Sequence, residues 1–354
     1  MEKQPTDGIL EEFRIEFLEC WRRLPNKGFF FILLAAWLAL FQFLGNSTLG
    51  YIHTTSLLRW MYNAYNPNIE NPITDDGHGL LVPFIVAGLF WWKRKQLTAL
   101  PLDAWWPSLI VVGCGLMLHL AGYALQEARI SIVGLFTGIY GLTGLAWGLA
   151  WLRASFFPFV LFVFCVPFGS LAEPVTFPLR LLVSRLVELV SHYVLAIEVQ
   201  RVGTQLFAPP DAANPGGQYQ YEVAPACSGM RSLIATLAMA LIYGVLCFPR
   251  WWKRAVLVVS AFPLAVFGNL IRMLTIIIAA EIGGQKAGNY VHDGGPGGIL
   301  KLLPYIPAFF GLLLLGHWLG EAPVGRVLPP NEGAARGEPA SATVSPAESE
   351  EVRA

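Results

Sequence analysis

The sequence predicts an all-α, polytopic membrane protein of about eight transmembrane helices, capped by a small extracytoplasmic amphipathic helix and β-hairpin. Of its 354 residues, 55% are hydrophobic and only 14% are charged, whereas about 25% of the residues in soluble domains are charged. Apolar runs of spanning length recur along the chain, separated by charged or turn residues. The net charge is zero, which argues against a nucleic-acid partner.

Eight apolar runs are long enough to be read as spans, although the second and fifth are short and the fifth contains a proline. Between the fifth and sixth runs lies a long stretch that we expect on the outer side of the membrane. The predicted spans are 29–44, 80–92, 107–125, 130–151, 156–168, 229–248, 255–280 and 302–319.

Basic residues set the predicted orientation, because loops rich in Lys and Arg stay in the cytoplasm. The N-terminal segment 1–28 and the cluster Lys93-Arg94-Lys95 carry many of these residues, so both termini are predicted to be cytoplasmic. No cleavable signal peptide is expected before the first span. The predicted organisation is a cytoplasmic segment 1–28, a transmembrane domain 29–320, and a tail 321–354 whose composition predicts disorder.

The stretch before the sixth span contains the predicted cap. Residues 177–197 have apolar side chains at helical spacing with Arg180, Arg185, Glu188 and His192 interleaved. This pattern is typical of an amphipathic helix on the outer leaflet. Segments 199–207 and 218–223 alternate like two strands joined by a turn at 209–217.

The five cysteines form no Cys-x-x-Cys pair and no zinc-like pattern with histidine. Cys227 and Cys247 lie near opposite ends of one predicted span, about 30 Å apart at about 1.5 Å per residue. A disulfide between them is excluded by that distance. We therefore expect a free thiol at Cys227 and neither metal nor cofactor.

Cys227 stands where the sixth span begins, next to Ser228, with Arg231 one helical turn further on. A thiol at a helix N-terminus beside a cation is biased toward the nucleophilic thiolate. Either Ser228 or Cys227 can cap the helix. A charged residue one turn inside a span is costly, which makes Arg231 a functional candidate.

Two further residues of the predicted outer face suit the same chemistry. Arg272 lies in the outer half of the seventh span, three residues after Asn269, and His292 follows in a Gly-rich loop beside Asp293. A cysteine nucleophile needs a base with a pKa near neutral, and histidine is the usual one. A guanidinium can stabilise charge on a tetrahedral intermediate. Helix direction places these residues on one side of the membrane.

Each residue also has an ordinary interpretation. A lone membrane cysteine is usually packing, a helix-terminal arginine reaches lipid phosphates, and a loop histidine is usually surface. His119 and His317 lie within spans and are expected to be packed or hydrogen-bonded. The joint occurrence of Cys227, Arg272 and His292 on one face favours a catalytic site.

Four sequence blocks resemble the exosortase/archaeosortase family of membrane sorting enzymes. They are 226–233 (Ala-Cys-Ser-Gly-Met-Arg-Ser-Leu), 269–272 (Asn-Leu-Ile-Arg), His292, and 76–83, where Gly77 stands at a position commonly occupied by serine. The likeness extends over about residues 25–320.

The resemblance implies Cys227 as nucleophile, Arg272 as electrostatic partner and His292 as general acid/base, with His78 helping to shape the site. A histidine at the third position indicates the bacterial branch and hence the inner membrane. The implied substrates are C-terminal sorting signals of exported proteins, which combine a Pro-Glu-Pro-type motif, a transmembrane helix and a basic cluster. Membrane lipids surround the site, and a lipid- or glycan-linked acceptor would make the enzyme a transpeptidase. Some relatives carry an extra domain linked to polysaccharide export, for which the tail from 321 is too short.

Two other function classes fit parts of the pattern. A membrane acyltransferase acting on lipids would use the same cysteine and histidine. A non-catalytic transporter or export scaffold would use Arg231 and Arg272 along an anionic pathway, although the two similar halves typical of transporters are not seen. A quinone-linked thiol oxidase is disfavoured because no redox cysteine pair is present.

Overall fold

The computed structural model describes residues 5–46, 54–66, 76–168, 173–210, 214–223 and 230–320. Cys227 and Ser228 lie outside these ranges, as does the predicted tail 321–354. Met230 and Arg231 are placed in a helix, but their side chains are not described.

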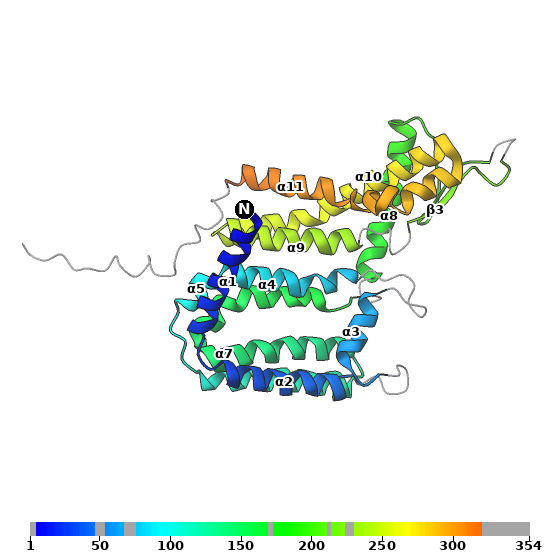
Figure 1. Cartoon of the computed structure of the whole chain (residues 1–354). Coiled ribbons are helices and arrows are strands. Elements are labelled where there is room, and N and C mark those ends of the chain that lie inside the picture. Colours follow the sequence, from blue (N-terminus) through cyan, green and yellow to red (C-terminus); the bar gives the residue numbers. More distant parts are fainter. Residues whose placement is uncertain are drawn as a thin grey trace, which may run out of the picture.

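Helices make up most of the described chain (Figure 1). The first group is α1 (Pro5–Arg23), α2 (Lys27–Leu44), α3 (Leu57–Tyr65), η1 (Gly77–Leu80), α4 (Val82–Trp92) and α5 (Arg94–Thr98). The second is η2 (Trp106–Ser108), α6 (Leu109–Ala124), α7 (Ala128–Val160), η3 (Leu161–Cys165) and α8 (Glu173–Tyr193). Strands β1 (Gln200–Val202), β2 (Gln205–Phe207) and β3 (Gln220–Glu222) precede α9 (Met230–Cys247), α10 (Trp251–His292), η6 (Pro296–Leu302) and α11 (Tyr305–Trp318).

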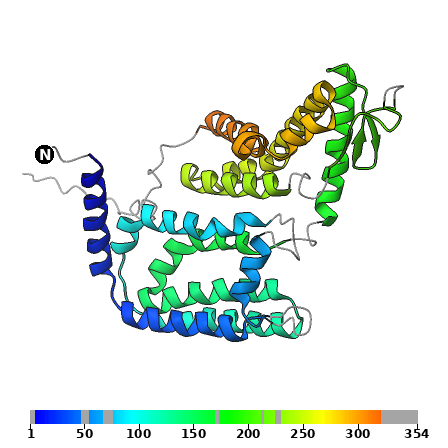
Figure 2. The same ribbon diagram turned by 45° about the vertical axis from the view of Figure 1, so that its right-hand side comes forward.

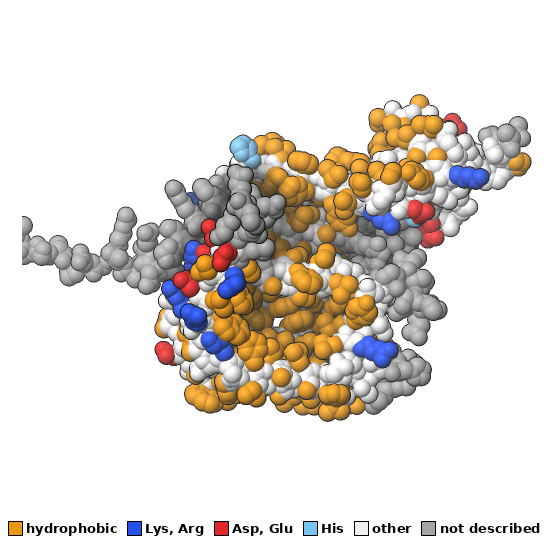
Figure 3. Space-filling model, in the orientation of Figure 1, with side chains coloured by type: hydrophobic (Ala, Val, Ile, Leu, Met, Phe, Trp, Pro, Cys, Tyr) orange, Lys and Arg blue, Asp and Glu red, His pale blue; other side chains and the backbone are white. Residues whose placement is uncertain are grey.

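The long helices lie side by side, and shorter elements cross their ends (Figures 1 and 2). We call the end crossed by α1 the α1 end, and the end crossed by α3 and α8 the α8 end. Hydrophobic side chains cover the middle of the molecule, while many of the charged ones gather toward its two ends (Figure 3). This distribution is expected of a protein whose middle lies in lipid.

The all-α membrane class is confirmed, but a count of eight spans is not. In the described residues, four helical segments are long and apolar enough to cross a membrane: Lys27–Leu44, Trp106–Ala124, Ala128–Cys165 and Trp251–His292. A fifth span results if η6 and α11, bent by 43°, are counted together. Gly77–Trp92 and Ser232–Cys247 are shorter apolar helices. These two helices are too short to count as spans, since a hydrocarbon core of about 30 Å requires about 20 helical residues.

The boundary between the fourth and fifth predicted spans lies earlier than expected. The chain bends at Gly148, whose φ of 95° is non-helical, inside the segment that we predicted to continue to 151. A Cβ atom at this position would lie 2.4 Å from the carbonyl oxygen of Asp103. Across the bend, the Tyr140 hydroxyl before it donates a hydrogen bond to the Leu152 carbonyl after it, at 2.8 Å. A glycine therefore permits the reversal, five residues before Arg153.

The cap contains a three-stranded sheet, not the predicted hairpin. The predicted strand 199–207 is divided by a turn at Gly203, with a φ of 62°, so that β1 and β2 pair antiparallel with Arg201 opposite Leu206. β3 pairs antiparallel with β2, with Leu206 opposite Tyr221. The predicted amphipathic helix is present as α8, although it begins and ends earlier than 177–197.

Three clusters of buried side chains form the core. The largest joins α2, α3, α4 and α7, and α9 also contributes to it through Ile234. The second joins α8, the sheet and the outer part of α10, and the third joins α9, α10 and α11. α10 is thus the element that connects the sheet of the cap to the membrane helices.

We expect the bend at Gly148 to depend on its missing side chain. Gly148→Ala should lower the free energy of unfolding by about 2 kcal/mol or more, because it combines a positive φ with a clash against backbone. The midpoint of thermal unfolding in detergent measures this change. Gly113→Ala is the matched control, because a Cβ there meets nothing within 4 Å. An equal shift in both variants would contradict the role given to the bend.

Candidate active site

α10 is longer than a bilayer is thick, and Arg272 lies far along it. It follows Trp251, the first residue of α10, by 21 residues, which is about 32 Å of helix. That length matches a hydrocarbon core of about 30 Å. The helix continues beyond Arg272 and projects past the α8 end of the bundle (Figure 1). Arg272 is therefore separated from the start of α10 by about one hydrocarbon thickness.

A double glycine then folds α10 back on itself. Gly283 has φ −128° and ψ 15°, and Gly284 has φ 69° and ψ −174°. The second pair of angles is essentially restricted to glycine. The returning part of α10 ends at His292, and Arg272 Nη2 donates a hydrogen bond to the His292 carbonyl oxygen at 3.4 Å. The structure thus brings together two of the three residues predicted to form the site.

The His292 ring is oriented by the next residue. Its Nδ1 lies 3.1 Å from Asp293 Oδ1, and the two side chains are 38% and 77% exposed. An ionised carboxylate only accepts hydrogen bonds, so Nδ1 carries the proton in this contact and Nε2 is the atom that exchanges a proton in neutral imidazole. Partial exposure leaves the imidazole accessible to a substrate.

Tyr221 of β3 packs against the same histidine. The two rings are stacked, with centroids 6.5 Å apart and planes inclined by 27°. The Tyr221 hydroxyl donates to the Gln285 carbonyl oxygen at 3.1 Å. Burial, together with the nearby Asp293 carboxylate, raises the pKa of Tyr221, so the hydroxyl remains a donor at neutral pH. Our sequence analysis did not single out Tyr221.

Gln285 clamps β3 to the returning part of α10. Its side-chain oxygen accepts from the Gln220 backbone N–H at 2.7 Å, and its amide nitrogen donates to the Gln220 carbonyl at 3.3 Å. A side-chain amide has both a donor and an acceptor, so it imitates a neighbouring strand. The Gly283-Gly284 pair was the sequence signal that could have revealed this fold-back, because adjacent glycines interrupt an otherwise helical pattern.

Asn269 lies one helical turn before Arg272 and is 1% exposed. Its neighbour Gly268 packs so tightly against the loop before α11 that a Cβ would lie 2.0 Å from the Pro304 carbonyl oxygen. This section of α10 is therefore held on one side by α11. The Asn269 side chain is therefore enclosed by protein and does not face solvent.

Arg180 differs from its predicted placement on the polar face of an amphipathic helix. It is only 4% exposed, and it lies one turn before Val183, which packs with Met273 and Ile277 of α10 in one cluster. Its guanidinium carbon lies 5.4 Å from the centre of the Phe177 ring. The inner face of α8 thus buries a cation beside α10.

The remaining predicted residues are placed as follows. His78 is half-buried in η1, in a region where Asp76 accepts a hydrogen bond from the Phe168 N–H at 3.2 Å. It therefore belongs to the helices of the N-terminal half, whereas Arg272 and His292 belong to α10. Cys227, Ser228 and the Arg231 side chain lie outside what the structure describes.

This arrangement has the chemistry of a proton-transfer site next to an anion-stabilising group. A guanidinium has five N–H donors, and one of those of Arg272 is used by the His292 carbonyl. No carboxylate of the described residues forms an ion pair with Arg272. Among the residues that the structure describes, no group of three or more His, Cys, Asp or Glu side chains could hold a metal ion.

Comparison with known proteins adds one finding. The family model described as transmembrane exosortase matches residues 72–314, which is more than half of the chain. This range includes Cys227, Arg272 and His292. No curated protein and no solved structure matches the chain significantly.

The packing of Tyr221 against α10 can be tested with a double-mutant cycle. A Cβ at Gly288 would lie 2.0 Å from the Tyr221 hydroxyl oxygen, so Gly288→Ala should destabilise the protein and lower its thermal unfolding midpoint. Tyr221→Phe alone should cost about 1 kcal/mol, the usual value of one hydrogen bond. When it is combined with Tyr221→Phe, Gly288→Ala should cost less, because the oxygen that it strikes is gone. Simple additivity of the two effects would contradict the contact.

Proposed function

Because the chain belongs to the transmembrane exosortase family, whose members are membrane sorting peptidases, we propose that it is a cysteine peptidase or transpeptidase that cleaves C-terminal sorting signals of exported proteins. The observation that carries the assignment of residues is the contact of Arg272 with His292 at the α8 end of the bundle. The proposed nucleophile is Cys227.

Chain connectivity supports the placement of Cys227 near this pair. It follows Val223 by four residues and precedes Met230 by three, which limits it to within about 14 Å and 11 Å of these residues at about 3.6 Å per residue. Val223 ends the β3 region, which Gln285 holds against α10. Met230 begins α9, which packs along α10. Both flanks of the cysteine are thus attached to the element that carries Arg272.

Helix register supports the same placement. A Cβ at Gly244 of α9 would lie 3.5 Å from the Arg254 Cα of α10. Antiparallel helices rise by the same amount per residue. Fourteen residues before Gly244 on α9, Met230 is therefore level with Gly268, which lies fourteen residues after Arg254 on α10. Arg272 is one turn beyond Gly268, in the direction of the residues that precede Met230. The start of α9 and the guanidinium therefore lie at a similar depth.

The proposed reaction begins when His292 Nε2 takes the thiol proton of Cys227. The thiolate attacks the scissile carbonyl carbon, and Arg272 donates to the oxyanion of the tetrahedral intermediate. His292 returns the proton to the departing amine as the carbon–nitrogen bond breaks, leaving a thioester. Water, or the amine of a lipid- or glycan-linked acceptor, then attacks the thioester, and the cysteine thiol is regenerated.

The level of the site agrees with such a substrate. A sorting signal with a transmembrane helix would be stopped by its basic cluster on the cytoplasmic side. Its recognition motif would then emerge on the opposite side, at the height of Arg272. We accordingly propose a bacterial inner-membrane location, with both termini in the cytoplasm and the site at the extracytoplasmic face. Asn269, Arg231, Ser228 and His78 are proposed as supporting residues.

We expect substitution at each of the three catalytic positions to abolish or strongly reduce processing. Cys227→Ala should leave no cleaved product. His292→Ala should reduce the rate by about 100- to 10,000-fold, and Arg272→Ala by about 100- to 1,000-fold. The measurement is the appearance of a shortened, tagged reporter that ends in a sorting signal from the same host, at matched enzyme levels in the membrane.

Matched controls separate chemistry from folding. Cys247→Ala removes a buried cysteine at the other end of α9, and His317→Ala removes a histidine in the last turn of α11; both should process normally. Hydroxylamine should release a hydroxamate of the substrate if a thioester forms. Cleavage by the Cys227→Ala enzyme would sink the assignment of the nucleophile. Acyl transfer to a lipid without reporter cleavage would favour the acyltransferase alternative.

A further inference from the structure

The N-terminal helix α1 carries a row of large apolar side chains. Phe13, Phe17 and Trp21 recur every four residues and so lie on one helix face. They are 49%, 45% and 39% exposed, which is unusual for such rings in a soluble environment. Our sequence analysis expected only a polar cytoplasmic segment here. The structure forms this segment into an amphipathic helix.

This row continues onto the membrane helices. The Phe13 ring lies 4.5 Å from Trp91 of α4, and the Phe17 ring lies 6.3 Å from it. The Trp21 ring lies 5.6 Å from Phe31 of α2. Phe31 itself is 45% exposed. Each ring of the row thus packs against α4 or α2 on one side and is partly exposed on the other.

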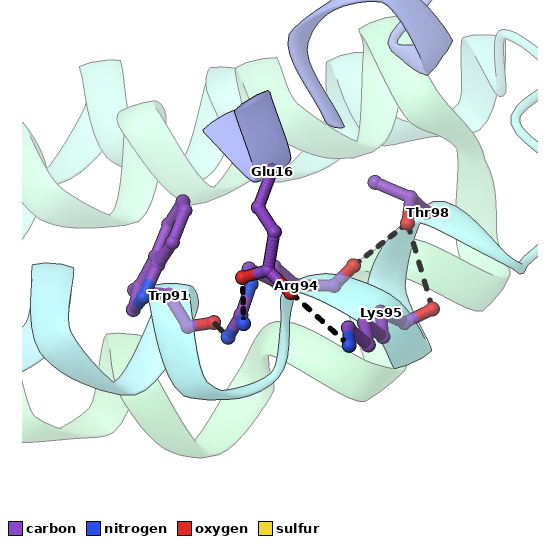
Figure 4. A network of polar contacts seen from close by, with 5 residues as sticks. All are labelled: Glu16, Trp91, Arg94, Lys95 and Thr98. Carbon is purple, nitrogen blue, oxygen red and sulfur yellow. Dashed lines mark hydrogen bonds and ion pairs between the residues drawn. The ribbon is translucent and has the colours of Figure 1, made fainter. Parts of the chain in front are cut away.

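An ion-pair latch fixes the rotation of α1 about its axis (Figure 4). Glu16 pairs with Arg94 and with Lys95, the latter at 3.2 Å. Arg94 also donates to the Trp91 carbonyl at 2.9 Å and lies 4.3 Å from the centre of the Trp91 ring. Hydrogen bonds from Arg94 and Lys95 lower the pKa of Glu16, so the latch is closed at neutral pH and opens as the pH falls through that lowered pKa.

The direction of α1 completes the geometry. It crosses the end of the bundle at a steep angle to the long helices (Figures 1 and 2), and α2 begins four residues after it ends. Exposed charged side chains lie on the rest of its surface, among them Glu11, Glu12, Glu19 and Arg22, together with two exposed aliphatic ones, Ile15 and Leu18. A helix in this position, with an aromatic row on one face and mostly charged side chains on the rest, suits the boundary between lipid and water.

We propose that α1 is an interfacial anchor whose row Phe13, Phe17 and Trp21 inserts among the phospholipids at the α1 end, with its rotation set by the Glu16 latch. The partner is the phospholipid surface, and the contact is apolar, because the charged face has more exposed carboxylates than a helix adapted to anionic headgroups would have. This surface is separate from the peptidase site and does not depend on the proposed reaction.

Spin labels in the full-length protein in lipid nanodiscs test the proposal. Labels go at Phe17→Cys and, as the matched position on the charged face, at Glu12→Cys, after Cys20→Ser, Cys114→Ser and Cys227→Ala. Cys165 and Cys247 are buried. The label at position 17 should collide several-fold more with oxygen, which dissolves in lipid, than with a water-soluble nickel chelate. The label at position 12 should behave oppositely. Phosphatidylcholine alone and its mixture with phosphatidylglycerol should give the same result.

Three results would overturn the lipid contact: equal exposure of both labels to the nickel chelate, protection of position 17 from both reagents, which would mean a protein partner, or insertion only with phosphatidylglycerol. The latch is tested by Glu16→Gln against Glu19→Gln, a substitution of the same type on the same helix. Only Glu16→Gln should increase collisions of the label at position 17 with the nickel chelate. The same increase in both variants, or in neither, would overturn the latch.

Discussion

The fold-back of α10 at Gly283-Gly284 is the constraint on which the candidate site depends. A continuous helix would carry His292 about 30 Å away from Arg272, whereas the break returns it to within hydrogen-bonding distance. The returning segment then offers Gln285 to β3 and a stacking surface to Tyr221. One unusual pair of backbone angles thus brings the His292 carbonyl to the Arg272 guanidinium and the His292 ring to Tyr221 of β3.

The length of α10 gives this fold-back its place relative to the membrane. Because α10 is longer than the hydrocarbon core is thick, a span that begins at Trp251 would carry Arg272 to the opposite boundary and the glycine break beyond it. A cation at that level avoids the cost of the bilayer centre, yet the surrounding apolar helices lower the local dielectric constant and so strengthen its effect on a developing anion. The His292 side chain is 38% exposed, so solvent reaches it.

The two ends of the bundle are built by different means. At the α8 end, the buried cluster of α8, the sheet and α10 holds the polar groups in place. At the α1 end, a half-exposed aromatic row and two ion pairs hold α1 to α4 and α5. Surface ion pairs alone contribute little, about 0–1 kcal/mol. The position of α1 therefore rests on apolar contact, and the ion pairs determine which way it faces.

Hydropathy and residue chemistry by themselves determined the membrane class, the family likeness and the choice of Arg272 and His292, because spanning length and charged residues at a membrane boundary leave a local signal. Tertiary structure alone decided the bend at Gly148, the division of 199–207 into two strands, the burial of Arg180, and the contact of His292 with Arg272 and Tyr221. These features arise where a glycine admits a rare backbone conformation or where distant segments meet. Neither a tolerated glycine conformation nor a contact between distant segments leaves a periodic pattern in the sequence. The first depends on which atoms an added side chain would strike, and the second on which residues of another segment lie nearby.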